Sequence, residues 1–189
     1  MSKISLPEAS NSFCPQSLFL YGTYKEDGTP NFALFSWFSY MWDSEFGVIA
    51  SIGEPKLTLD LIREKRVFSA NLVTEELLDA AHYCGTHGGA TEDKVAATGL
   101  RVARGEKLDV PTLADSPWTF ELEAAKIIEL PDSGGAVLLC KIHNTSVDER
   151  LVDKSVPVEE RLRLCSPVRY VDNKYFSGND GRLLGDAAE

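Results

Sequence analysis

Apolar and polar positions along the chain repeat mostly with the two-residue period of β-strands. Residues 16–24, 32–40 and 46–52 are rich in aromatic and apolar side chains and are separated by turn residues, which predicts three strands. Residues 118–124 alternate cleanly between apolar and polar side chains, as in a strand with one face toward solvent. Three further strands are expected at residues 67–72, 136–142 and 168–176.

The strand predicted at residues 32–40 is apolar on both faces. From Phe32 to Phe38, both sets of alternating positions are dominated by apolar side chains. A strand with one wet face would carry charged side chains there. We therefore expect a barrel interior on one side and a helix, a ligand or a partner subunit on the other. A turn at Asp27-Gly28, where glycine supplies a positive φ, joins this strand to the one before it as a hairpin.

Three helical segments interrupt the predicted strands. Residues 56–66 carry an apolar stripe beside charged positions. Thr74 is expected to cap a second helix that stops at Gly85, and Thr91 to cap a shorter helix that stops at Gly99. Six or seven strands with inserted helices predict a mainly β fold built around a small barrel.

Length and charge narrow the class of protein. A chain of 189 residues suits one domain over residues 1–189, with a core at about 14–176 and a loose C-terminal tail. The net charge of −10 disfavours nucleic acid as a partner, because an acidic surface repels phosphate backbones. No apolar window is long enough to span a membrane or resembles a signal peptide. Four scattered cysteines make no disulfide framework, so we expect a cytoplasmic protein.

Several common catalytic and nucleotide-binding motifs are absent from the sequence. There is no Gly-x-Gly-x-x-Gly, no Walker-type loop and no Gly-x-Ser-x-Gly elbow. His82, Cys84 and His87 are close together but fit no standard zinc spacing, so we expect no metal site. Cys84 is expected on the inner face of its helix, where packing is favoured over nucleophilic chemistry. The glycine-rich loop at residues 85–89 is either a helix stop or a ligand-facing segment.

Lys56 and Thr58 begin a predicted helix directly after a strand and a proline-containing turn. Free amides, the helix dipole, a hydroxyl and an ammonium group together make a phosphate site. The alternative interpretation is a surface lysine followed by a threonine at the start of a helix.

Short polar motifs follow one another in a fixed order between Asn31 and Leu100. The motifs are Asn31-Phe32-Ala33-Leu34-Phe35-Ser36-Trp37, Ala50-Ser51-Ile52, Lys56-x-Thr58, Ser69-x-Asn71, Glu92-Asp93-Lys94-Val95 and Thr98-Gly99-Leu100. Their order and spacing resemble the flavin reductase-like family, which is related to flavoredoxin and has an FMN-binding split β-barrel. The resemblance covers about residues 14–175 and implies that fold here.

The resemblance also implies a cofactor site. Bulky residues such as Phe32 and Phe35 stand where family members often have small serine or threonine residues, which implies a tighter or differently angled pocket. In an ideal strand Asn31 and Ser36 point to opposite faces, so both reach one flavin only through backbone atoms, a bulge or a turn. The implied residues are Asn31, Ala33, Ser36 and Trp37 at the flavin ring, Ser51, Ile52, Lys56 and Thr58 at the ribityl phosphate, and Asn71 and Lys94 completing the pocket.

By this resemblance the chain is an FMN-binding oxidoreductase that takes hydride from NADH or NADPH, between which the sequence does not choose. No side chain is assigned a catalytic role, because hydride transfer to flavin needs no general base. A homodimer is implied, and an electron-acceptor protein is a further possible partner. One alternative is a non-enzymatic FMN-binding electron-transfer protein of the same fold. Another is a module that binds haem or a similar planar ligand, although His82, His87 and His143 are the only histidines available as axial ligands.

Overall fold

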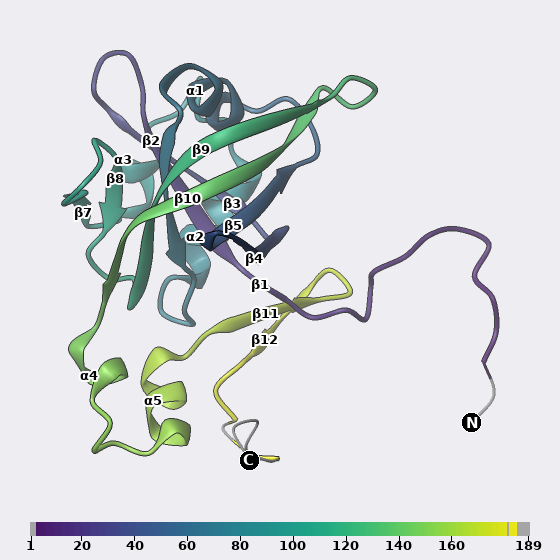
Figure 1. Ribbon diagram of the computed structural model, residues 1–189, viewed down its shortest axis with the longest axis vertical. Coiled ribbons are helices and arrows are strands. Elements are labelled where there is room, and N and C mark those ends of the chain that lie inside the picture. The colour runs from purple at the N-terminus through teal and green to yellow at the C-terminus, as the bar shows by residue number, and fades with distance from the viewer. Residues whose placement is uncertain (1–2, 181, 185–189) are drawn as a thin grey trace.

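A computed structural model describes residues 3–180 and 182–184 of the chain (Figure 1). Its body is a seven-stranded antiparallel sheet with the strand order β3-β2-β6-β9-β10-β5-β4. The strands are β2 (Phe19–Tyr24), β3 (Pro30–Phe35), β4 (Phe38–Asp43), β5 (Glu45–Ile52), β6 (Val67–Leu72), β9 (Trp118–Leu130) and β10 (Gly135–Val147).

The two end strands of this sheet, β3 and β4, are consecutive in sequence and are joined by Ser36 and Trp37. The sheet therefore curls until its ends come together, and it encloses an apolar core. Phe19 stacks on Phe38 across the closure, with ring centroids 4.1 Å apart. This arrangement is the mainly β barrel, open at one seam, that the sequence predicts.

One predicted strand is wrong, because residues 32–40 form the ends of two strands. Ser36 and Trp37 leave the ladder with β2, and Phe38 pairs with Ala50 of β5. The Ser51 amide donates to the Trp37 carbonyl at 2.9 Å, which fixes the bend. The chain must turn here because it passes from one end of the sheet to the other.

The expectation that β3 is covered on both faces is confirmed. Ala33 and Phe35 pack inside the barrel. Phe32 and Leu34 pack outside it with Ala81 and neighbouring residues of helix α2 (Leu78–Thr86). The cover on the second face is therefore a helix of the same chain.

The three predicted helices are present, with shifted ends. Helix α1 (Leu57–Lys65) ends at Arg66, which adopts a left-handed conformation with φ of 64°. Helix α2 continues through Gly85, the residue predicted to stop it. Helix α3 (Lys94–Thr98) ends at Gly99 as predicted, but its cap is Asp93, whose carboxylate accepts from the Ala96 amide.

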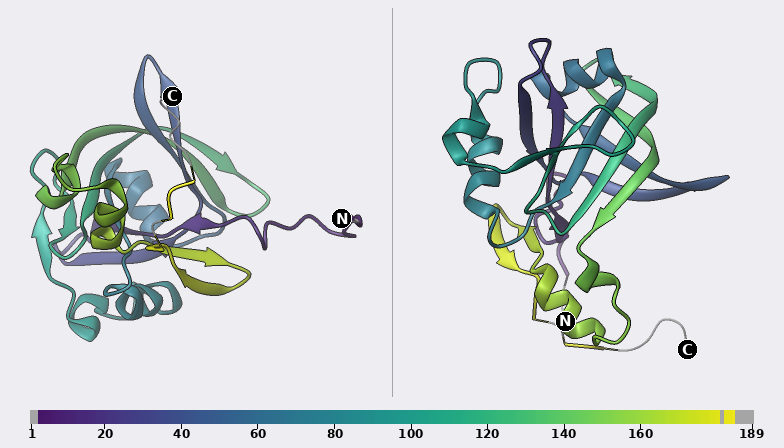
Figure 2. Two further views of the ribbon diagram at one scale, coloured as in Figure 1. Left: turned by 90° about the horizontal axis from the view of Figure 1, so that it is seen from below. Right: turned by 90° about the vertical axis from the view of Figure 1, so that its left-hand side faces the viewer.

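The remaining elements lie around the barrel. Figure 1 shows α4, α5 and the β11–β12 hairpin beside one end of it, and Figure 2 shows the β4–β5 hairpin projecting from its wall. None of the described helices is long and apolar enough to cross a membrane. These elements are β1 (Gln16–Ser17), β7 (Val102–Arg104), β8 (Pro111–Leu113), α4 (Glu149–Val152), α5 (Val158–Cys165), β11 (Val168–Val171) and β12 (Lys174–Ser177).

The start of the predicted loose tail is held in place. The Gly178 amide donates to the Pro167 carbonyl at 2.7 Å, and the Ser177 hydroxyl donates to Glu75 at 2.6 Å. The described residues beyond it, 179, 180 and 182–184, form no helix or strand, and residues 181 and 185–189 lie outside the described residues.

Candidate functional site

Three adjoining pockets open along β3, which is an end strand of the sheet, and Leu34 lines all of them. The lysine pocket, of about 370 Å³, is lined by Asn31, Ala33, Leu34, residues 55–58, residues 84–90 and Lys94. The tryptophan pocket, of about 280 Å³, is lined by residues 34–37, Ser51, Gly53, Glu54 and Lys56. The tyrosine pocket, of about 220 Å³, is lined by Leu18, residues 34–36, His82, Gly85, Thr86, Tyr170 and Tyr175.

Asn31 is buried at the inner wall of the lysine pocket. Its Nδ2 donates to Thr58 Oγ1 at 3.0 Å and to Thr23 Oγ1 at 3.3 Å. Its Oδ1 is buried and accepts no hydrogen bond from any described residue. Gly89 lies against this oxygen, and a Cβ at position 89 would approach it to 2.0 Å. A buried acceptor without a donor is costly, and here it adjoins an open pocket.

Lys94 places a cation in the same pocket while being only 4% exposed. Its Nζ donates to the Cys84 carbonyl at 3.0 Å, and no carboxylate of the described residues pairs with it. Burial lowers the pKa of Lys94 below the ordinary lysine value. An anion bound in the pocket would form an ion pair with the Lys94 ammonium group.

The start of helix α1 forms the adjacent wall. The amides of Leu57 and Thr58 precede the first intrahelical hydrogen bonds, so they are free to meet an anion. Lys56 lines both the lysine and the tryptophan pockets and pairs with Glu54 at 2.6 Å. Two lysines and a helix N-terminus thus converge on one end of the cleft.

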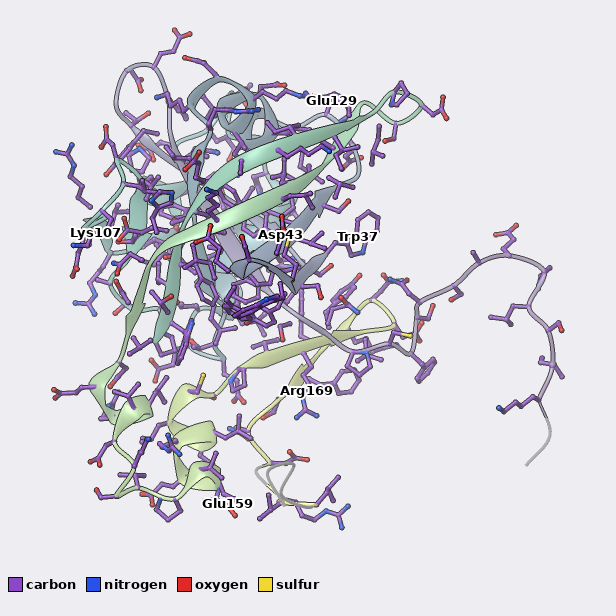
Figure 3. The ribbon with its side chains drawn as sticks, viewed as in Figure 1. Trp37, Asp43, Lys107, Glu129, Glu159 and Arg169 are labelled. Atoms are coloured by element: carbon purple, nitrogen blue, oxygen red, sulfur yellow. The ribbon has the colours of Figure 1, made fainter. Side chains whose placement is uncertain are left out.

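The tryptophan pocket has a different character. Trp37 lies at the bend between β3 and β4, is 52% exposed, and projects its ring away from the ribbon (Figure 3). Gly53 lies under the ring, where a Cβ would come within 2.8 Å of it. Ser36 and Ser51 add hydroxyls beside this aromatic surface. The cleft is therefore cationic at one end and aromatic at the other.

The tyrosine pocket lies between α2 and the β11–β12 hairpin. His82 Nδ1 and Tyr175 Oη are 3.0 Å apart, which joins the two elements. Tyr170 lies beside Tyr175, with ring centroids 5.8 Å apart. Burial raises the pKa of Tyr175, so this phenol keeps its proton through the neutral range.

The structure brings eight of the ten predicted site residues to the cleft, in a different grouping from the one expected. Asn31 and Ala33 lie with Thr58 in the lysine pocket, and Ser51 lies with Ser36 and Trp37 in the tryptophan pocket. Asn31 and Ser36 both reach the cleft because Ser36 lies beyond the end of β3.

Ile52 and Asn71 lie elsewhere. Ile52 is 1% exposed in the barrel core. Asn71 is fully buried, donates to the Leu20 carbonyl at 2.9 Å, and accepts from the Leu113 amide at 2.9 Å. Its hydrogen bonds therefore join β2, β6 and β8, and its side chain does not line the cleft.

Sequence reasoning missed the contribution of the C-terminal hairpin to the site. Tyr170 and Tyr175 come from β11 and β12, 88 and 93 residues beyond His82, and only the fold brings them together. Gly53 was also missed, although its place between a strand and Pro55 marked a tight turn. The described residues hold no cluster of three or more His, Cys, Asp or Glu side chains suited to a metal ion.

A larger hollow, of about 680 Å³, lies between β8 and α5, and several of its charged groups are paired within the chain. Glu121 accepts from the amides of Glu106, Lys107 and Leu108, and Arg150 pairs with Asp148. Glu121 and Arg150 are therefore not free to meet a ligand there.

Known proteins share this fold along the whole chain. Flavoredoxin of Desulfovibrio vulgaris (Miyazaki F) is 26% identical, with a TM-score of 0.86 over 98% of this chain and 97% of that one. Flavoredoxin from Methanosarcina acetivorans has a TM-score of 0.82 at 21% identity, covering 99% and 96% of the chains. An FMN-binding protein from Thermus thermophilus has a TM-score of 0.75 at 20% identity, covering 98% of each.

Comparison of sequences finds one relative that matches part of the chain and one family model that matches most of it. An uncharacterised protein from Aeropyrum pernix is 32% identical over 83 residues, which is 43% of this chain and only 32% of that protein's length. The family model described as the flavin reductase like domain matches residues 11–178. The chain therefore belongs to the flavin reductase-like family.

Proposed function

We propose that the lysine and tryptophan pockets together bind FMN, and that the protein is an NAD(P)H-dependent flavin oxidoreductase. The observation that carries this proposal is Lys94, a buried cation without a carboxylate partner among the described residues. It faces a cleft whose opposite end is an exposed tryptophan. FMN has the matching shape, because it carries a phosphate dianion at one end and a flat aromatic ring at the other.

The residues of the cleft fit this cofactor. Lys56, Lys94 and the first amides of α1 would hold the phosphate, which a helix N-terminus favours. Trp37, with Ser36 and Ser51, would contact the ring. The orphaned Asn31 Oδ1 is an acceptor suited to a hydroxyl of the ribityl chain. Asn71 and Ile52 support the barrel wall instead.

Bound FMN would supply the capacity to accept and release two electrons, and the chain supplies position and electrostatics. The two lysines favour an anionic ligand and fix its direction in the cleft. Gly53 and Gly89 let the backbone lie directly against Trp37 and Asn31, where a larger side chain would not fit. The nicotinamide donor remains NADH or NADPH.

We also infer a homodimer, on grounds that differ from those in the sequence. The second face of β3, which suggested a partner subunit, is covered by α2. The projecting β4–β5 hairpin instead exposes Tyr40, Trp42 and Phe46 at 52%, 76% and 51%. Cross-strand pairing places Phe46 opposite Trp42, so the three rings share one face. Such an exposed aromatic face favours association.

A second candidate is a non-enzymatic FMN-binding electron-transfer protein. The half-exposed Trp37 at the ring end of the cleft favours it, because a protein partner could approach the flavin there. The two functions differ in their response to nicotinamide nucleotides. The test is the visible spectrum of the FMN-loaded protein during anaerobic addition of NADH or NADPH, followed by dithionite.

Bleaching of the flavin bands by either nucleotide would support the oxidoreductase and identify its donor. Bleaching by dithionite alone would favour the electron-transfer protein. Failure to bind FMN in excess would contradict both.

A further inference from the structure

One wall of the lysine pocket is a loop, residues 85–91, that packs no side chain into the core. Gly89 is its only buried residue, and the other six are exposed. The loop meets the barrel through its backbone, since a Cβ at Gly85 would come within 3.0 Å of Leu34 and one at Gly89 within 2.0 Å of Asn31. A segment with so few buried apolar contacts has little local stability of its own. Its position must therefore depend on the bonds at its two ends.

Tyr83 and Glu92 join those two ends. Tyr83 lies in the last turn of α2, and Glu92 lies two residues before Lys94, the first residue of α3. The Tyr83 hydroxyl donates to Glu92 Oε2 at 2.7 Å. This hydrogen bond to a carboxylate raises the pKa of Tyr83, so the phenol keeps its proton as the donor through the neutral range. The bond closes the loop at its base.

His87 supports Tyr83 in this position. The two rings are nearly parallel, with centroids 3.7 Å apart and an angle of 8° between their planes. The His87 amide donates to the Tyr83 carbonyl at 3.1 Å, and His87 Nδ1 is also 3.1 Å from that oxygen. At the other end of the loop, the amides of Thr91 and Glu92 donate to the Gly88 carbonyl at 3.2 and 3.1 Å. Tyr83, His87 and Glu92 thus form a clasp at the base of the loop.

The clasp lies beside the bond that holds Lys94. Lys94 Nζ donates to the carbonyl of Cys84, the residue after Tyr83, so two bonds link the same two segments. Lys94 is 4% exposed, whereas the side chain of Lys56 is 36% exposed and can follow a ligand more freely. The Lys94 ammonium group therefore lies where the backbone at the start of α3 places it. A shift of that backbone would move the charge relative to an anion, and Coulomb attraction falls with distance.

The charge of Glu92 separates two interpretations of this residue. A carboxylate two residues from Lys94 repels a phosphate, so a Glu92 that acted only through its charge would weaken FMN binding. A Glu92 that acts through its bond to Tyr83 would strengthen FMN binding, because it holds Lys94 in position. The geometry favours the second interpretation, since Tyr83 engages the carboxylate and Glu92 does not line the lysine pocket.

We propose that Tyr83 and Glu92 are positioning residues for the phosphate of FMN. Their hydrogen bond, supported by the stacked His87, holds the start of α3 against the end of α2 and keeps Lys94 and the loop backbone at the phosphate end of the cleft. This role rests on the proposed function, and it makes the clasp a determinant of the preference for FMN over riboflavin. Neither Tyr83 nor Glu92 lines the pocket, so both act through Lys94 and the loop.

The experiment measures dissociation constants of FMN and riboflavin, by quenching of flavin fluorescence, for the full-length wild type and four variants. Tyr83→Phe removes the hydroxyl and keeps the ring that stacks on His87. Glu92→Ala removes both the acceptor and the charge, whereas Glu92→Gln removes the charge and keeps an acceptor oxygen. The fourth variant combines Tyr83→Phe with Glu92→Ala. Hydrogen–deuterium exchange of the amides of residues 87 and 91 is measured without ligand, and thermal melts verify that the variants fold.

Tyr83→Phe and Glu92→Ala should each weaken FMN binding about fivefold, as for the loss of one hydrogen bond, and change riboflavin binding by less than about twofold. The double variant should bind FMN no more weakly than Glu92→Ala alone, because both substitutions remove the same bond. Glu92→Gln should bind FMN at least as tightly as the wild type, because the bond is kept and the repelling charge is lost. Amide exchange should be faster in Tyr83→Phe and Glu92→Ala and unchanged in Glu92→Gln.

Tighter binding of FMN by Glu92→Ala would overturn the proposal, because it would show that Glu92 acts through its charge. Equal weakening of FMN and riboflavin by Tyr83→Phe would also overturn it, as would wild-type FMN affinity or unchanged amide exchange in that variant. A wild type that binds FMN no more tightly than riboflavin is a different outcome. It would contradict the phosphate site of the proposed function and, with it, the role of the clasp in phosphate binding.

Discussion

Asn31 donates from Nδ2 to Thr58 Oγ1 at 3.0 Å and thereby ties the start of β3 to the first turn of α1. The bond sets the distance between the barrel wall and the helix N-terminus that faces the lysine pocket. Its other amide atom, Oδ1, accepts no hydrogen bond from the described residues. The free protein therefore carries a buried acceptor that a ligand can satisfy.

Asn31→Ala is expected to lower the rise in Tm that saturating FMN produces. The variant loses the acceptor offered to the ligand and the link to Thr58, and FMN affinity should fall about tenfold. Differential scanning fluorimetry with and without FMN measures the rise. Thr23→Val is the control, since it removes the other partner of Asn31 and lies outside the cleft. An equal effect of the two substitutions would show that Asn31 acts only through packing.

Lys94→Met is expected to affect stability and FMN binding in opposite directions. Burial lowers the pKa of Lys94, so its protonated form is less favourable in the folded chain than in the unfolded chain. Removing the charge should raise the free energy of unfolding at neutral pH by about 1–2 kcal/mol and weaken FMN binding at least tenfold. Denaturant unfolding and FMN titration measure the two effects.

The pH dependence of that stability gain follows from the same shift. The charge of Lys94 lowers the free energy of unfolding by its full amount at pH values well below the folded pKa. This destabilisation disappears as the pH rises past the ordinary lysine pKa of 10.5. The difference in unfolding free energy between Lys94→Met and the wild type should therefore shrink as the pH approaches that value. Lys174→Met, at an exposed position, should show no such trend. A gain that is constant with pH would contradict the assignment to the buried charge.

Glu121→Gln is expected to destabilise the fold by about 3 kcal/mol. Burial alone would raise the pKa of Glu121, but donors from Asn144 and the amides of Leu108, Lys107 and Glu106 hold it below the usual value. The stability contributed by this carboxylate is present above the unfolded pKa and is lost as the pH falls through the lower folded pKa.

Denaturant unfolding from pH 7 to pH 3 measures this effect, and the difference between variant and wild type should narrow toward acid. Glu123→Gln, half-exposed on the same strand, should change stability by less than about 0.5 kcal/mol. If Glu121→Gln lowers the free energy of unfolding by no more than the control does, the hydrogen bonds that Glu121 accepts do not stabilise the fold as expected.

Trp42→Glu is expected to convert the proposed homodimer to monomer. A charge at the centre of the aromatic face of the β4–β5 hairpin would have to be desolvated on association. Sedimentation velocity across a range of concentrations measures the assembly. Val152→Glu, a control at the exposed position 152 of α4, should leave it unchanged. A wild-type chain that is monomeric at all concentrations would contradict the proposal.

The sequence predicted the barrel well because its strands have strong local patterns. The alternating residues of β9 and the apolar residues of β5 and β6 were located within a few positions. The break at Ser36 and Trp37 was missed, since both flanking segments are equally apolar and nothing local marks the change of partner strand. Helix α5 was missed because half of its eight residues are charged and none of them is buried.

The candidate site was predicted in part for a similar reason. Lys56 and Thr58 were identified from the local chemistry of a helix start, and that chemistry depends on adjacent residues. The grouping of Asn31 with Thr58, and of Ser51 with Trp37, depends on how the sheet curls. Asn71 was predicted to contact the ligand. Its side-chain amide is instead hydrogen-bonded to the Leu20 carbonyl and the Leu113 amide, which lie on strands far away in sequence.

Binding of FMN by the lysine and tryptophan pockets is tested by comparing FMN with riboflavin, which lacks the phosphate. Dissociation constants for both are measured by quenching of flavin fluorescence, with the wild type and with Lys56→Ala. If the lysine pocket holds the phosphate, the wild type should bind FMN more tightly than riboflavin, and Lys56→Ala should weaken FMN binding about tenfold while leaving riboflavin binding nearly unchanged. Equal affinity of the wild type for the two flavins, or equal loss for both in Lys56→Ala, would contradict a phosphate site in the lysine pocket.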